Sequence, residues 1–226
     1  SIMSYYGQYG QDEFLFKNYF EKLKDHKGFF LDVGAMEGRH CSNSKFFEDQ
    51  LGWSGILVEP NPNIIPTLKE NRSKGSWEIL EKAVVPNNCN DSEVPFYAME
   101  DSYGMGYSGR TECYDSQHYE RVKREHQQGL VKCFPPKTIN VPTVKIDALL
   151  EGIETVDIMS LDTEGGELDL LKSINFDDTY IKTMTVENNS GDPRFRYFME
   201  SKGFTHVADL GCDQLFVNKK FEEEIS

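Results

Sequence analysis

The chain has 226 residues, of which 38% are hydrophobic and 27% are charged. This composition is typical of one globular domain and excludes a disordered or low-complexity chain. Asp and Glu total 38 against 24 Lys and Arg, for a formal net charge of −14. Such a charge argues against a nucleic-acid partner and against an anionic membrane surface. The longest apolar runs are also far shorter than the roughly 18 residues that a membrane span requires.

The five cysteines are odd in number and form no C-x-x-C pair. This pattern is not typical of a disulfide framework or a cysteine zinc site. Nothing at the first residues resembles a signal peptide. We therefore expect reduced thiols in a cytoplasmic protein.

The first third of the chain predicts alternating helices and buried strands. Residues 9–24 have helical apolar spacing, and we expect residues 1–27 to form an N-terminal helical lid. Continuous apolar runs predict buried parallel strands over residues 29–33, 55–59 and 77–85. Helices are expected between them, from Ser42 or Ser44 to Leu51 and over residues 64–73.

A less regular segment, residues 91–142, reads as an insertion. It predicts a strand at 94–99, a Gly- and Tyr-rich loop at 102–116, a charged helix at 117–128 and an edge strand at 138–146. Regular alternation then returns, with strands at 155–161, 180–186, 204–208 and 214–217 and helices at 165–173 and 192–202. This order predicts a doubly wound, mostly parallel seven-stranded α/β sheet with an antiparallel terminal strand, in one domain over residues 1–226.

The first two strand ends suggest a nucleoside site, because ligands of such sheets bind at the carboxyl ends of the strands. Gly34 and Gly38 follow the first strand, and Glu59 ends the second, 21 residues after Gly38. Glycines let the backbone approach a ligand, and an acidic residue at this spacing accepts both ribose hydroxyls. The plain alternative is a tight turn and a solvated glutamate.

The identity of the nucleoside follows from what the loop lacks. Residues 34–38 read G-x-x-x-G and not G-x-G-x-x-G, and Glu37 would repel a pyrophosphate. A cationic ligand without phosphate, such as S-adenosylmethionine, fits an acidic loop better. An NAD-dependent oxidoreductase and a non-catalytic interaction domain remain the alternatives.

Further acidic residues follow the strands at 155–161 and 180–186. Asp162 and Glu164 end the first of these strands, and Glu187 and Asn188 end the second. A single carboxylate is more often a helix cap, but a cluster on neighbouring strand ends favours a site.

At these motifs the sequence resembles the FkbM-type methyltransferases, which use S-adenosylmethionine and largely O-methylate sugars and related hydroxyls. The matching segments are residues 9–12 (YGQD), 30–35 (FLDVGA), 52–62 (GWSGILVEPNP), 144–147 (VKID) and 161–167 (LDTEGGE). The resemblance implies a Rossmann-like class I methyltransferase fold. Met36 departs from the family, which usually has Asn there, so a side-chain bond to the donor is in doubt at this position.

The resemblance implies three groups of site residues. The donor group is Tyr9, Gln11, Asp32, Gly34, Ala35, Met36, Gly38, Ser42, Glu59, Pro60, Asn61, Ala83, Val84 and Asp162. For proton removal the expected residues are Asp162, Glu164, Glu187 and His206; alternatively, Asp162, Glu187 and Asn188 hold Mg²⁺ or Mn²⁺. A structural role is the commoner one for a histidine such as His206.

The expected acceptor is a carbohydrate, either a glycan or an activated sugar, with a deoxyhexose such as rhamnose preferred. Its site is expected in the insertion, at Asp101, Ser102, Tyr103, Tyr107 and Arg110. The plain alternative is a Tyr-rich surface loop. Arg121 and Arg124 allow a nucleotide diphosphate sugar if they line the cleft; otherwise they belong to a solvated helix.

Overall fold

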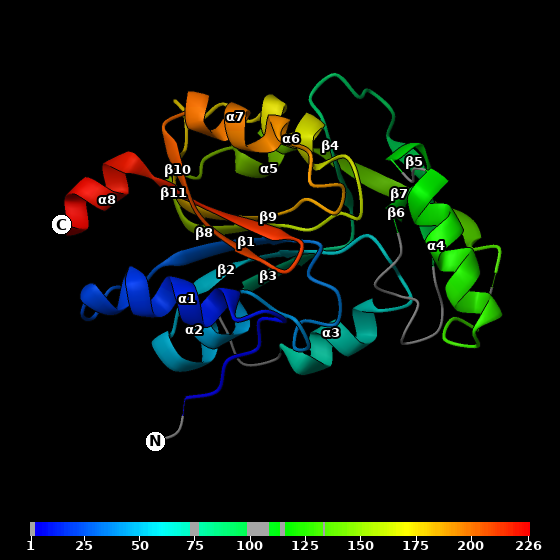
Figure 1. Cartoon of the computed structure of the whole chain (residues 1–226), viewed down its shortest axis with the longest axis horizontal. Helices are drawn as coiled ribbons and strands as arrows, with labels where there is room; N and C mark the ends of the chain where they lie inside the picture. The colour runs from blue at the N-terminus through cyan, green and yellow to red at the C-terminus, as the bar shows by residue number, and fades with distance from the viewer. Residues whose placement is uncertain (1–2, 73–76, 99–108, 114–115, 133) are drawn as a thin grey trace.

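The computed structural model describes residues 3–72, 77–98, 109–113, 116–132 and 134–226. Its main sheet consists of β1 (Phe29–Val33), β2 (Ser54–Val58), β3 (Trp77–Leu80), β8 (Thr155–Leu161), β9 (Tyr180–Glu187), β10 (Phe204–Leu210) and β11 (Asp213–Asn218). The spatial order is β10-β11-β9-β8-β1-β2-β3 (Figure 1). Strands β9, β8, β1, β2 and β3 are parallel, and β11 runs antiparallel to β9. The predicted doubly wound, seven-stranded α/β fold is therefore confirmed.

Helices cover both faces of this sheet (Figure 1). One layer holds α1 (Gln11–Asn18), the short η1 (Phe20–Lys22), α2 (Lys45–Leu51) and α3 (Ile65–Asn71). The other holds α5 (Ile146–Leu150), α6 (Glu167–Ser173) and α7 (Arg194–Ser201). A last helix, α8 (Lys219–Ile225), follows β11 and was not predicted; Phe221 anchors it in the core with α1 and α2. No helix among the described residues has the length and apolar character to span a membrane.

The N-terminal helix differs from the expected lid. Leu15, Phe16 and Phe20 are buried in the cluster between the sheet and α2, where Phe20 packs edge-on against Trp53. Burying three large apolar side chains stabilises the fold by several kcal/mol, at about 1.5–3 kcal/mol each. The segment is therefore part of one face of the core.

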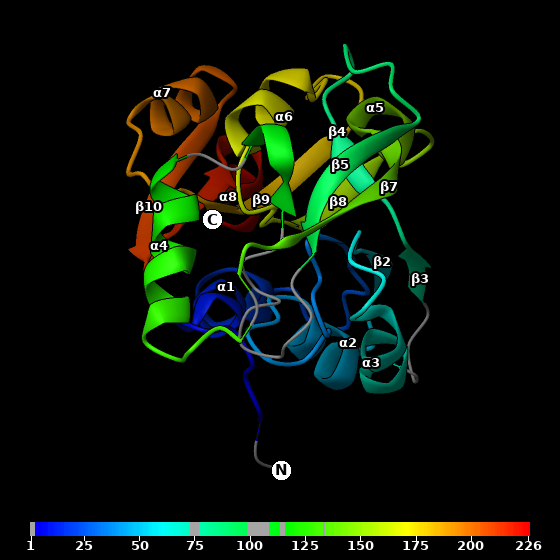
Figure 2. The same ribbon diagram turned by 90° about the vertical axis from the view of Figure 1, so that its right-hand side faces the viewer.

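A second, four-stranded sheet stands beside the first, with the order β4-β7-β5-β6. Its strands are β4 (Ala83–Val85), β5 (Glu93–Ala98), β6 (Gly109–Arg110) and β7 (Lys137–Lys145). Between β6 and β7 the chain forms η3 (Thr111–Cys113) and α4 (Ser116–Gln127). Figure 2 shows α4 standing in front of the strand ends.

This second sheet corrects two predictions. The expected strand at 77–85 is two strands in two sheets, because β4 leaves β3 to pair in parallel with β7. The expected edge strand at 138–146 is instead an inner strand, β7, which pairs with β4 on one side and β5 on the other. Its Val141 packs with Val94 and Phe96 in a small hydrophobic core that belongs to this second sheet.

Candidate functional site

The sheet order creates a crevice between β1 and β8. From β1 the chain proceeds outward to β2 and β3, and from β8 it proceeds the other way to β9. At such a switch point the loops after the two strands diverge, which leaves a site at their carboxyl ends. The predicted residues follow these strand ends.

The loop after β1 lies close to the end of β8. Gly34 has φ of 86°, and a Cβ there would lie 1.7 Å from the Asp162 carbonyl oxygen. The Gly34 and Ala35 amides both donate to the Val58 carbonyl. Only glycine fits this conformation and this close approach. The absence of a side chain at Gly34 thus lets the loop after β1 pack against the end of β8.

Glu59 organises the same loop. Its carboxylate accepts the Met36 amide at 2.8 Å and the Asn61 amide at 2.9 Å. The side chain is 3% exposed, and burial raises its pKa to about 7 despite these bonds. Glu59 therefore fixes Met36, which has φ of 58°, opposite the end of β2.

A buried ionic network supports the loop from below. Arg72 is fully buried; its Nε donates to Glu48 at 2.9 Å, and its Nη1 donates to the Gly38 carbonyl and to Ser44 Oγ. Ser44 Oγ in turn donates to Asp32 Oδ2 at 2.7 Å. Burial raises the pKa of Asp32, and the Ser44 bond and the Arg72 charge oppose that rise. Asp32 thus supports the loop indirectly, through Ser44 and Arg72.

A narrow cavity, here called the donor slot, opens above the loop. Its volume is about 40 Å³, which is close to the space of one water molecule in the liquid. The slot is lined by Val33, Gly34, Met36, Val58, Glu59, Pro60, Lys82, Ala83, Val84, Phe96, Arg110, Asp162, Thr163 and Glu164.

Three carboxyl groups meet beside the slot: Asp162, Glu164 and Glu187, here called the carboxylate triad. One oxygen of each lies within 4.8 Å of one oxygen of each other. The pairing register explains the approach, since Leu161 pairs with Val186 and the next residues project together. Among the described residues, no donor reaches Asp162 Oδ1 or Glu187 Oε1, although both atoms are buried.

Burial, and then the charges of neighbouring carboxylates, raises the pKa of every member of the triad. Burial raises the pKa of Asp162 to about 7, and the neighbouring carboxylates of Asp213 and Glu167 add to the rise. The pKa values of Glu164 and Glu187 are also raised, first by burial and then by neighbouring charges, which are Asp162 and Glu167 for Glu164 and Asp162 and Glu164 for Glu187. Perturbed carboxyls of this kind are typical of functional sites.

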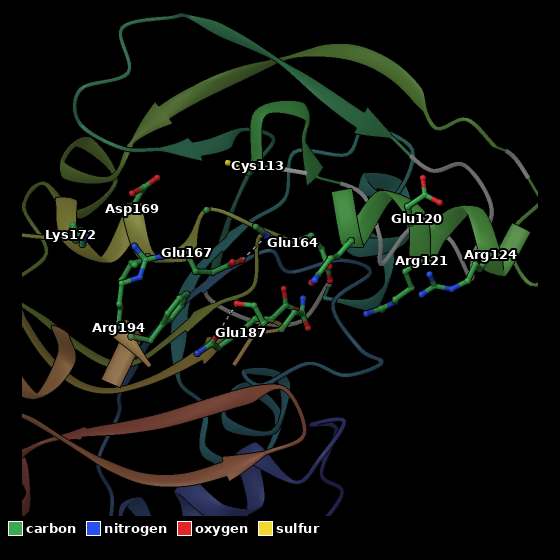
Figure 3. Close-up of a pocket in the computed structure, with 18 residues that line it drawn as sticks. Cys113, Glu120, Arg121, Arg124, Glu164, Glu167, Asp169, Lys172, Glu187 and Arg194 are labelled. Carbon is green, nitrogen blue, oxygen red and sulfur yellow. Dashed lines mark hydrogen bonds between the residues drawn. The ribbon is translucent and has the colours of Figure 1, made fainter. Parts of the chain in front are cut away.

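A second cavity of about 930 Å³, the acceptor cleft, opens on the far side of the triad. Figure 3 shows Glu164 and Glu187 near its centre, Arg121 and Arg124 on α4 to one side, and Arg194 and Lys172 to the other. Glu164 lines both the cleft and the donor slot. The triad therefore separates a narrow cavity from a wide polar one.

Several predicted residues lie elsewhere. His206 is on β10, where Nε2 lies 2.7 Å from Asp209 and the ring packs on Phe216; it does not join the triad, because β11 separates its strand from β9. Asn188 lines the cleft, but its Oδ1 accepts the Asp192 amide and the Ser190 hydroxyl. Its amide oxygen is thus already used, and Glu164 takes its place beside Asp162 and Glu187.

The N-terminal motif is bound to the β10–β11 turn. Gln11 Nε2 donates to Asp213 at 2.9 Å, and the Tyr9 ring lies against Gly211. Ser42 Oγ accepts the Lys45 amide at the start of α2, and Asn61 Oδ1 accepts the Asn63 amide. The contacts described for these four predicted residues are thus with the protein's own loops, and none of the four lines the slot.

The acceptor predictions are largely outside the described residues, which is where Asp101, Ser102, Tyr103 and Tyr107 fall. Arg110 is described; it lines the donor slot and donates to Cys113 Sγ. Sequence analysis missed Thr163 and Glu167 as site residues, and also Arg72. A glutamate after two glycines, such as Glu167, is only a weak indication of a site residue. The sequence around Arg72 is that of a surface helix and does not indicate that this arginine is buried.

The family model of the methyltransferase FkbM domain matches residues 32–208. No curated protein matches the chain in sequence.

Solved structures that match the chain at low sequence identity include the following three. Monomeric WbdD is 10% identical with a TM-score of 0.46, over 92% of this chain and 41% of that one. The N-terminal domain of human METTL16 in complex with SAH is 13% identical with a TM-score of 0.40, over 91% and 65%. The 16S rRNA methylase ArmA is 12% identical with a TM-score of 0.34, over 92% and 82%. The chain thus spans less than half the length of WbdD. On the family match over residues 32–208, the chain belongs to the FkbM methyltransferase domain family.

Proposed function

We propose that the protein transfers a methyl group from S-adenosylmethionine to a sugar hydroxyl of a glycan, with a deoxyhexose such as rhamnose as the preferred acceptor. The observation that carries this proposal is the placement of Glu164, which lines both the donor slot and the acceptor cleft. A methyl donor in the slot and a hydroxyl in the cleft would meet across the triad.

The donor assignment rests on the β1–β2 side of the crevice. Glu59 would accept hydrogen bonds from the ribose hydroxyls. The protein backbone at Gly34 would lie against the methyl donor, and Ala83 and Val84 would border the adenine. The acidic surroundings favour a sulfonium over a pyrophosphate. Family membership does not favour the alternative of an NAD-dependent oxidoreductase.

The reaction is an in-line displacement. The sugar oxygen forms a bond to the methyl carbon, the carbon–sulfur bond breaks with its electron pair on sulfur, and the hydroxyl proton moves to a carboxylate. Asp162 or a triad neighbour is the proton acceptor, because a carboxyl with a pKa near 7 is suited to general-base work at neutral pH. Alignment of the oxygen, carbon and sulfur supplies much of the acceleration.

The triad also fits a divalent cation such as Mg²⁺ or Mn²⁺. Asp162, Glu164 and Glu187 offer hard oxygen ligands, and the buried Asp162 Oδ1 and Glu187 Oε1 have no donor among the described residues. A bound cation would lower the pKa of the acceptor hydroxyl. Chelation by EDTA should then abolish turnover, and readdition of Mg²⁺ or Mn²⁺ should restore it; turnover indifferent to EDTA would remove the cation from the proposal.

The function is tested by incubating a panel of oligosaccharides with isotopically labelled S-adenosylmethionine and analysing the products by mass spectrometry. A mass increase of one labelled methyl on a saccharide is expected. Calorimetric titration with S-adenosylhomocysteine and with NAD tests the donor separately. Heat from NAD alone, or no methylated saccharide despite donor binding, would contradict the proposal.

A further inference from the structure

Residues 163–166 form a strained turn between β8 and α6. Glu164, Gly165 and Gly166 all have positive φ, of 54°, 120° and 79°. For a non-glycine residue such as Glu164, this left-handed conformation costs roughly 1–2 kcal/mol. Strain of this kind persists only where surrounding groups hold it.

One carboxylate oxygen holds both residues that flank Glu164. Glu167 Oε2 accepts the Thr163 amide at 2.9 Å, the Thr163 hydroxyl at 2.7 Å and the Gly165 amide at 3.1 Å. The Glu167 residue is 6% exposed; burial raises the pKa of its carboxyl, and the hydrogen bonds from Thr163 and Gly165 oppose that rise. The turn is thus closed from the α6 side.

The opposite side of the turn is closed by Cys113. A Cβ at Gly165 would lie 2.4 Å from the Cys113 carbonyl oxygen, and a Cβ at Gly166 would lie 2.7 Å from Cys113 Sγ. Cys113 therefore holds the glycine end of the turn. The Cys113 contacts and the Glu167 bonds together set the direction in which Glu164 leaves the backbone.

We propose that Glu167 is a positioning residue, whose carboxylate holds the 163–166 turn so that Glu164 reaches the carboxylate triad. This inference rests on the proposed methyl transfer, because the triad is the group that it serves. Without Glu167 the turn can return to negative φ, which moves the Glu164 side chain away from Asp162 and Glu187. A misplacement of about 1 Å at a reacting centre costs about 100-fold in rate.

The test compares Glu167→Ala with Glu167→Gln. The carboxamide oxygen of Gln can accept the Thr163 and Gly165 amides, while the Thr163 hydroxyl can donate to the Gly165 carbonyl 2.8 Å away, whereas Ala accepts none of these bonds. We expect Glu167→Ala to lower kcat by about 10–100-fold with little change in the KM for S-adenosylmethionine, and Glu167→Gln to recover most of the loss. Equal losses in the two variants would overturn positioning, because charge and not hydrogen bonding would then be the cause.

Glu222→Gln is the matched control. Glu222 also lies in the first turn of a helix and accepts a threonine hydroxyl, that of Thr205, at 2.6 Å, but it is on α8 away from the site. This variant should keep wild-type kcat. Should Glu167→Ala fail to fold, Thr163→Val removes one of the three bonds and should lower kcat by a smaller factor; wild-type kcat in Thr163→Val would contradict the proposal.

A second measurement separates this inference from the proposed function. Hydrogen exchange of the Thr163 and Gly165 amides needs no acceptor and no turnover. We expect both amides to lose protection in Glu167→Ala and to keep it in Glu167→Gln. Unchanged protection in Glu167→Ala overturns the positioning role. Loss of protection in Glu167→Ala, with a wild-type enzyme that methylates no saccharide, overturns the proposed function alone.

Discussion

The Glu59 side of the donor slot and the carboxylate triad satisfy their polar groups in opposite ways. At Glu59, both carboxylate oxygens accept backbone amides. At the triad, Asp162 Oδ1 on the slot side and Glu187 Oε1 on the cleft side are buried without a donor among the described residues. The Glu59 side is therefore organised by the protein itself, whereas the triad keeps bonding capacity that a substrate or cation can use.

The largest effect should come from the unsatisfied side. Asp162→Asn keeps the size of the side chain but removes a proton acceptor, so turnover should fall by about 10²–10⁴-fold. Rates with labelled donor measure the effect, and the midpoint of thermal unfolding should stay near that of the wild type. Asp177→Asn, in an exposed turn, is the control. A near-normal rate in Asp162→Asn would place the chemistry away from the triad.

The second prediction tests the close contact between Gly34 and the Asp162 carbonyl. Gly34→Ala adds a Cβ against the Asp162 carbonyl at φ of 86°, so the free energy of unfolding should fall by about 3–5 kcal/mol. Gly152→Ala is matched, since Gly152 has φ of 76° but nothing within 4 Å of its Cβ position. Chemical denaturation of both variants measures the difference. Equal losses would mean that contact with β8 contributes nothing.

The third prediction concerns the pH dependence of stability. Burial raises the pKa of Glu59 to about 7 from its usual 4.5, so between these values the folded state holds a proton that the unfolded state has lost. The stability from this group is present below pH 4.5 and disappears as the pH rises through 7. This contribution amounts to about 3 kcal/mol. In Glu59→Gln the decrease in the free energy of unfolding between pH 4.5 and 7 should be smaller by that amount. Denaturant unfolding at several pH values measures it; parallel curves for the two proteins would contradict the burial argument.

The smallest effect concerns donor affinity. Glu59→Ala removes the expected ribose acceptor, and S-adenosylhomocysteine should bind more weakly by roughly 1–3 kcal/mol. Calorimetry checks the value, with Glu81→Ala as the control, because Glu81 is exposed and its carboxylate lies 3.4 Å from the Lys69 ammonium at the surface. Unchanged affinity in Glu59→Ala would remove this residue from the site.

Sequence reasoning was strongest where function follows from neighbours in the chain. The buried strands β1 and β8 appear as continuous apolar runs, and the spacing from Gly38 to Glu59 places an acid at the end of β2. Asp162 and Glu187 also follow from topology, because parallel neighbouring strands end at one edge.

The remaining features depend on contacts that no local pattern encodes. The split between β3 and β4 arises from pairing with β7, which is far along the chain. The direction of the Asn188 amide is set by its own turn with Asp192, and the position of His206 depends on which strand forms the sheet edge. Arg72 and Glu167 act through buried hydrogen bonds that only the folded chain reveals.

Because Glu164 belongs to the walls of two cavities, the two ligands cannot be energetically independent if either one displaces it. Thermodynamic reciprocity then requires that the factor by which a bound saccharide changes the affinity for S-adenosylhomocysteine equal the factor by which S-adenosylhomocysteine changes the affinity for the saccharide. A single shared side chain thereby turns two binding equilibria into one coupled equilibrium.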